Sequence, residues 1–162
     1  MINRVGYVMM PEKEFIKRYH IIGVIEVRKA DVCVTHHSLS RYRERLKQAD
    51  IKVSLKELRL LHRLRTHLRE SDYLIHYNPV KAILANRMEK AVYRFYDGWV
   101  YVLIWSRDQN VWVLKTIYPL DGEMFEIIEL ASEEEKNNSW DSEYEPPKAK
   151  TSKVGSKKSK KR

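Results

Sequence analysis

The stretch A-V-Y-R-F-Y-D-G-W-V-Y-V-L-I-W-S-R-D-Q-N-V-W-V-L-K-T-I-Y-P, residues 91–119, decides the fold. It contains three runs of branched and aromatic residues, separated by Asp97-Gly98 and by a polar segment at 106–110. Asp-Gly is typical of a two-residue hairpin turn, and branched and aromatic side chains favour strands. The stretch therefore predicts an antiparallel meander of three strands. Its central strand, 99–105, is apolar on both faces, as expected of a strand that is covered on both sides.

Hydrophobic periodicity predicts further elements on both sides of this meander. Branched apolar residues indicate strands at 20–27 and 32–34, and the run at 124–130 fits an edge strand or a short helix. Ser54 and Glu57 have the S-x-x-E spacing of a capping box ahead of a leucine-rich helix. Helices are expected from residue 11, over 35–46, over 55–70, and over about ten residues from Asn78. The predicted fold class is α+β, with helices packed on a three- to four-stranded antiparallel meander sheet.

The length of 162 residues fits one domain with a tail. We expect residues 1–131 to form a single α+β domain. From Ser132 the sequence is acidic and then rich in Lys and Ser, with too little apolar surface to offset the entropy of ordering. Residues 132–162 are therefore predicted to be a disordered, acidic-then-basic tail. Such a tail could bind nucleic acid loosely, act as a sorting signal or keep the protein soluble.

Cysteine use and hydropathy indicate the compartment. Cys33 is the only cysteine, which excludes an intrachain disulfide and agrees with a reducing environment. Its flanking valines suggest a small buried apolar side chain rather than a nucleophile. No stretch is long and apolar enough to span a membrane, and the N-terminus lacks the apolar core of a signal peptide. We expect a cytoplasmic protein with no membrane partner.

The formal net charge of +9 is unevenly distributed. Residues 148–162 contain eight basic and no acidic residues, so the other 147 residues have a net charge of about +1. Within them, 36–69 hold ten Lys or Arg against three Asp or Glu, whereas 70–147 hold seven against fifteen. A basic face of this kind suits a polyanion such as RNA, because local potential steers a ligand more than net charge does. It equally suits a protein whose two halves attract each other.

The basic segment opens with a helix that has two different faces, T-H-H-S-L-S-R-Y-R-E-R-L at 35–46. At 3.6 residues per turn, His37, Arg41 and Arg45 stack on the side opposite its Leu and Tyr residues. Arginine is always cationic and binds phosphate through a fork of donors, while histidine exchanges a proton near neutral pH. This face therefore suits phosphate chemistry, although a solvated basic face has the same pattern.

Most motifs of cofactor and metal chemistry are absent from the sequence. There is no glycine-rich phosphate loop, no H-E-x-x-H and no pair of cysteines. Cys33, His36 and His37 would need a further ligand to bind zinc, and nothing in the pattern requires one. We therefore expect no metal and no cofactor.

Metal-free RNA cleavage needs only a base for the ribose 2′-OH, cations and donors for the phosphate, and an acid for the leaving oxygen. Suitable side chains occur on the 35–46 helix and at the end of the third strand, where Lys115, Thr116 and Tyr118 lie. Adjacent strand residues point to opposite faces, so Lys115 and Thr116 can line one site only if a bulge intervenes.

The arrangement as a whole resembles the RelE/BrnT-type toxin ribonucleases of the barnase–EndoU–colicin–RelE class. The resemblance covers about residues 32–120 and rests on T-H-H-S-L-S-R-Y-R-E-R at 35–45 and V-W-V-L-K-T-I-Y-P at 111–119. It implies a metal-independent ribonuclease of toxin type that cleaves RNA by 2′-OH transesterification. The RNA would include ribosome-associated message, and an antitoxin or other protein would be a partner. The implied catalytic residues are His37 as acid or base, Arg41 and Arg45 as phosphate ligands, Thr116 as a donor, and Lys115 or Tyr118 as assistants.

The main alternative is a nucleic-acid-binding regulator without catalysis. Phosphates would then bind a basic helical face and the tail, through Arg59, Arg63, Arg65, Arg69, Lys157, Lys158, Lys160 and Lys161. This alternative predicts an affinity that falls steeply with salt, and no cleaved product. A third alternative is an interaction module whose charged faces bind other proteins.

Overall fold

The computed structural model describes residues 2–74, 91–120, 130 and 132–140. The elements, in chain order, are β1 Asn3–Val5, α1 Lys13–Tyr19, β2 Ile21–Val27, β3 Ala30–Thr35, α2 His36–Gln48, α3 Glu57–Glu70, β4 Asp72–Leu74, β5 Ala91–Tyr96, β6 Trp99–Ser106, β7 Val111–Pro119 and α5 Glu133–Asn138. The helix expected from Asn78 lies outside the described residues, as does all of the run at 124–130 except Leu130.

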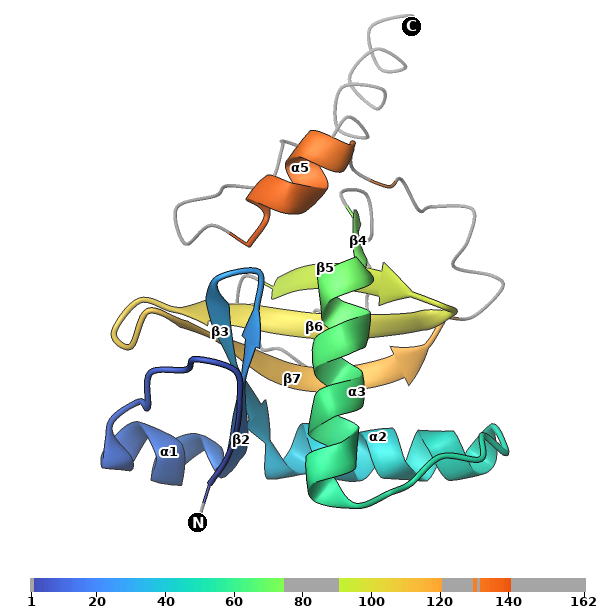
Figure 1. Cartoon of the computed structure of the whole chain (residues 1–162), viewed down its shortest axis with the longest axis horizontal. Coiled ribbons are helices and arrows are strands. Elements are labelled where there is room, and N and C mark those ends of the chain that lie inside the picture. Colours follow the sequence, from blue (N-terminus) through green and yellow to red (C-terminus); the bar gives the residue numbers. More distant parts are fainter. Residues whose placement is uncertain (1, 75–90, 121–129, 131, 141–162) are drawn as a thin grey trace, which may run out of the picture.

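All seven described strands belong to one mixed sheet, in the order β1-β2-β3-β7-β6-β5-β4 (Figure 1). The predicted meander is present as β5, β6 and β7, which pair antiparallel. The expectation of a three- to four-stranded antiparallel sheet is nevertheless wrong, because β1 pairs parallel with β2 and β3 pairs parallel with β7. Val32 faces Trp112 across the second of these pairings, 80 positions away. The periodicity of a local stretch does not indicate which distant strand it pairs with. It therefore cannot show that β1–β3 and the meander β5–β7 form one sheet.

The leucine-rich helix α3 covers one face of this sheet (Figure 1). Its four buried leucines belong to the largest apolar cluster, together with side chains of β2, β3, β6 and β7; they are Leu60, Leu61, Leu64 and Leu68. The expected capping box at Ser54 is not formed, since the N-cap is Lys56 and its side chain makes no capping hydrogen bond. The close packing of α3 on β2 requires Gly23, where an added Cβ would lie 2.6 Å from Leu61 Cδ1.

The opposite face has a second apolar cluster under α1. Phe15 of α1 packs with Cys33, Ile104 and Val113, which come from β3, β6 and β7. Cys33 is fully buried, and burial raises the pKa of its thiol to about 12. The prediction that Cys33 is a buried apolar residue is therefore confirmed.

The folded part of the chain extends beyond Ser132, where the sequence predicted disorder. Helix α5 follows a capping box formed by Ser132 and Glu135, and Trp140 is 5% exposed within the main core. Unfavourable composition did not prevent order here because one aromatic side chain and several polar contacts hold a short segment on the body. Residues 141–162 lie outside the described part of the chain.

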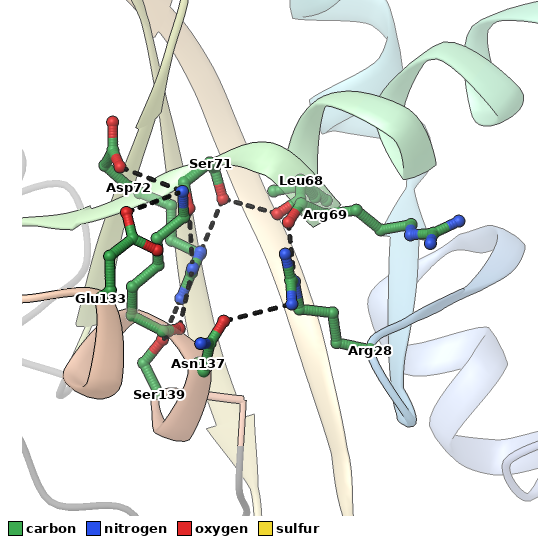
Figure 2. A network of polar contacts seen from close by, with 10 residues as sticks. Arg28, Leu68, Arg69, Ser71, Asp72, Glu133, Asn137 and Ser139 are labelled. Atoms are coloured by element: carbon green, nitrogen blue, oxygen red, sulfur yellow. Dashed lines mark hydrogen bonds and ion pairs between the residues drawn. The ribbon is translucent and has the colours of Figure 1, made fainter.

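The polar contacts of this C-terminal segment centre on a buried arginine, Arg94. Figure 2 labels two of its partners, Ser71 and Ser139. Its guanidinium donates to Ser71 Oγ at 2.7 Å, to the Ser71 carbonyl at 3.0 Å and to Ser139 Oγ. The same group lies 4.2 Å from the ring centroid of Trp140. At the edge of the network Lys136 forms an ion pair with Asp72, 3.3 Å between Nζ and Oδ1. The segment is thus held by specific contacts to β4 and β5.

Candidate nucleic-acid interface

The start of α2 is fixed by a reciprocal cap at Thr35. Thr35 Oγ1 accepts from the Ser38 amide at 3.1 Å, and Ser38 Oγ accepts from the Thr35 amide at 3.2 Å. The Thr35 hydroxyl also contacts the Leu114 carbonyl at 3.3 Å, which links the first turn of α2 to β7. Because the chain leaves β3 at this cap, α2 begins beside the middle of β7.

From that point α2 runs along β7 in the same direction (Figure 1). Thr35 contacts Leu114, and ten residues later the guanidinium of Arg45 lies over the ring of Tyr118, 5.8 Å from its centroid. The pairing of β3 with β7 ends at Leu114, so α2 takes the place of a strand beside the second half of β7. The two stretches on which the family resemblance rests are therefore neighbours in space.

A β-bulge in β7 changes which side chains share a face. Val102 pairs with Thr116 and Leu103 pairs with Leu114, so Lys115 is an extra residue without a partner on β6. Thr116 lies opposite Val102 on the face remote from α3, and Lys115 Nζ lies 5.7 Å from the ring centroid of Tyr19 at the end of α1. The bulge thus brings Lys115 and Thr116 to the same face, which a regular strand would not do.

Arg45 is the most enclosed cation of the row on α2. Its Nη1 is buried and has no hydrogen-bond partner among the described residues. Burial lowers the pKa of this guanidinium, and the neighbouring charge of Arg41 lowers it further. Arg45 is thus a partly desolvated cation beside Tyr118, and the part of its side chain that remains exposed is suited to an anionic ligand.

The two other members of the row, His37 and Arg41, are exposed. Arg41 Nη1 lies 3.0 Å from Glu44 Oε2 in an ion pair whose side chains are 48% and 57% exposed. Exposed pairs of this kind contribute little to stability, so a phosphate could displace Glu44 at low cost. The row therefore presents an imidazole and a guanidinium to solvent, followed by the enclosed Arg45.

The arginines expected to form one basic face of α3 lie on two flanks instead. Arg65 Nε donates to the Glu26 carbonyl at 2.8 Å, and its Nη2 lies 3.7 Å from the Glu26 carboxylate. The backbone carbonyl of Arg69, on this same flank, accepts from Arg28 Nε at 2.8 Å (Figure 2). Arg59 and Arg63 lie on the other flank, which faces α2 and the β5–β6 hairpin, as Arg63 Nε donates to Tyr42 Oη at 2.9 Å. The tail lysines 157, 158, 160 and 161 lie outside the described residues.

Sequence reasoning missed a group of aromatic and polar side chains beside Arg63. His67 Nδ1 lies 3.3 Å from Tyr101 Oη, and its ring lies 4.7 Å from that of Tyr96. The spacing of Arg59, Arg63 and His67, four apart on a helix, was the available signal for this flank. The hydroxyl and ring partners come from α2, β5 and β6, so no local pattern could show them.

No known protein family, curated protein or solved structure matches this chain. Among the described residues, no cluster of His, Cys, Asp or Glu has the arrangement of a metal site. Within the same part of the chain, no helix is long and apolar enough to cross a membrane.

Proposed function

We propose that this protein is a metal-independent ribonuclease whose site lies between α2 and β7. The observation that supports the proposal most strongly is the position of α2 beside β7, where Thr35 contacts Leu114 just before the bulged Lys115–Thr116 pair and Arg45 lies over Tyr118. Residues 46–110 separate the two stretches in sequence, yet α2 and β7 lie side by side in the fold.

The proposed reaction uses only side chains of this chain. His37 removes the proton of the ribose 2′-OH, the 2′ oxygen attacks phosphorus and the bond from phosphorus to the 5′ oxygen breaks. The products are a 2′,3′-cyclic phosphate and a 5′-OH, whose proton is returned by the imidazolium. Arg41 and Arg45 hold the non-bridging oxygens as negative charge develops, and Thr116 donates a hydrogen bond to the phosphate. Lys115 or Tyr118 assists them as a further cation or hydrogen-bond donor for the phosphate.

The test is incubation of purified protein with labelled RNA in EDTA, followed by denaturing and native gels. The wild-type protein is expected to cleave RNA and to leave DNA of the same sequence intact. His37→Ala is expected to lower the cleavage rate by about 10²–10⁴-fold while RNA binding persists, because it removes one acid–base group. His36→Ala is the matched control, since His36 is exposed on the same turn.

Three results would count against this function. Equal cleavage by wild type and His37→Ala would refute the catalytic assignment. Binding of RNA and DNA without any product would instead support the non-catalytic regulator. Absence of both binding and cleavage would leave the basic face as a surface for a protein partner.

A further inference from the structure

The second flank of α3 holds a row of three residues that the ribonuclease site does not use. Arg59, Arg63 and His67 are four apart, so they lie one above another along the helix. Arg59 is exposed, and Arg63 and His67 are half-buried. The row faces α2 and the β5–β6 hairpin, as the contacts of Arg63 with Tyr42 and of His67 with Tyr96 show.

Arg63 is held in one orientation by its neighbour on α2. Its Nε donates to Tyr42 Oη, and Tyr42 is itself 1% exposed in the main core. The terminal nitrogens of Arg63 make no hydrogen bond or ion pair with other described residues. A guanidinium fixed through Nε keeps both terminal nitrogens for a phosphate, and little side-chain entropy is lost on binding because the orientation is already set.

His67 is held by two aromatic residues of the sheet. Its Nδ1 faces the hydroxyl of the buried Tyr101, and its ring lies against Tyr96 with an interplanar angle of 33°. Burial lowers the pKa of His67, the charge of Arg63 lowers it further, and Asp97 at the hairpin tip opposes the shift. The ring is therefore neutral at neutral pH. A neutral imidazole packed on a half-exposed tyrosine is suited to stacking on a nucleobase rather than to binding a phosphate.

We propose that Arg59, Arg63, His67 and Tyr96 form a subsite for single-stranded RNA. The two arginines bind consecutive phosphates, and the His67–Tyr96 pair stacks on one base. A single strand is required because the faces of bases in a duplex are already covered by their neighbours. Asp97 limits the subsite at the hairpin tip, where its carboxylate repels phosphate.

This inference rests on the proposed function for its choice of RNA as the ligand. The two sites lie on opposite sides of α2, which holds Tyr42 toward α3 and Arg45 toward β7. An RNA strand that crosses α2 contacts both. The subsite thus sets the substrate class, because it selects unpaired RNA over duplex RNA.

The experiment measures binding of a fluorescein-labelled 2′-O-methyl oligoribonucleotide of about ten nucleotides by fluorescence polarisation. This probe lacks the attacking hydroxyl, so binding is measured without cleavage. Tyr96→Leu is expected to weaken binding about tenfold through lost stacking. Arg59→Gln is expected to weaken it and to reduce the slope of log affinity against log salt by about one. Arg69→Gln, exposed on the opposite flank of α3, is the matched control and is expected to bind as the wild type does.

Arg59 is exposed, so Arg59→Gln keeps the inference testable even if Tyr96→Leu loses its fold, which thermal unfolding would show. Equal effects of Arg59→Gln and Arg69→Gln would overturn the subsite, as would equal affinity for a duplex of the same composition or no binding of the probe. If wild-type protein cleaves RNA but Arg59→Gln binds the probe normally, the subsite fails and the ribonuclease proposal stands. If the protein cleaves no RNA but its binding of the probe depends on Arg59, the ribonuclease proposal fails and the subsite stands.

Discussion

Arg94 shows how one residue can determine the position of a whole segment. It is 1% exposed, and its planar guanidinium reaches Ser71 on one side and Ser139 on the other while stacking on Trp140. A rigid fork of five donors can satisfy several acceptors at once, whereas an ammonium group cannot reproduce that geometry. The charge alone is therefore not sufficient at this position.

Arg94→Lys is expected to lower the free energy of unfolding by about 2–4 kcal/mol, because buried acceptors of Ser71 and of the C-terminal segment lose their donors. Urea unfolding followed by tryptophan fluorescence measures the change. Arg107→Lys, at an exposed position in the β6–β7 turn, is the control and is expected to change stability by less than about 0.5 kcal/mol. Equal stabilities of the two variants would show that the network around Arg94 contributes nothing specific.

Single residues were predicted well where the pattern around them is local. Cys33 is buried, as its flanking valines indicated, and Tyr42 is buried on the helix side that the 3.6-residue period assigns to its Leu and Tyr residues. His67 and Tyr101 were not recognised as a pair, because they lie 34 positions apart on different elements. Strand geometry predicts that Lys115 and Thr116 share a face only if a bulge intervenes. The position of that bulge depends on the register of β7 against β6, which the local sequence does not show.

At the scale of elements, the position of α2 depends on its N-terminal cap. Thr35 satisfies an amide of the first turn and also contacts β7, so it sets where the His37–Arg41–Arg45 row begins. The expected helix start at Thr35 agrees with the structure to within one residue. The helix α3 begins later than predicted, and the short elements β1, β4 and α5 were missed because three to six residues carry too little periodicity.

Thr35→Ala is expected to lower the free energy of unfolding by about 1–2 kcal/mol, since the cap is lost. Thr35→Ser keeps the hydroxyl and should recover most of this loss. Thr66→Ala removes an exposed hydroxyl that bonds only to the carbonyl four residues earlier, and it serves as the control. The measurement is again urea unfolding. A Thr35→Ala protein as stable as Thr66→Ala would mean that the cap does not hold α2 on β7.

At the scale of the molecule, the two charged regions belong to different parts of the chain. The described body holds the helical cations of α2 and α3, while the eight basic residues of 148–162 carry most of the net charge. The seven-stranded sheet could not be predicted from the sequence, because its centre is the pairing of β3 with β7. The separation of the basic region 36–69 from the basic tail, in contrast, is visible in composition alone.

A chain that ends at Pro147 is expected to unfold at the same temperature as the full chain but to bind RNA more weakly. Its formal net charge falls from +9 to about +1, so fewer counterions are released on binding and the affinity depends less on salt. Polarisation titrations of the 2′-O-methyl probe at several salt concentrations measure the slope. An unchanged slope would show that Lys157, Lys158, Lys160 and Lys161 do not contact the nucleic acid.

The parallel pairing of β3 with β7 also has a consequence for protein synthesis. Val32 leaves the ribosome long before Trp112, its partner across the sheet, has been translated. The strands β1, β2 and β3 can form their own small sheet early, but the apolar edge of β3 stays unpaired until β7 has been synthesised. Non-local pairings of this kind slow folding and leave apolar surface exposed in the meantime. The nascent chain therefore passes through a stage in which the apolar edge of β3, Ala30–Thr35, is unpaired and prone to aggregation.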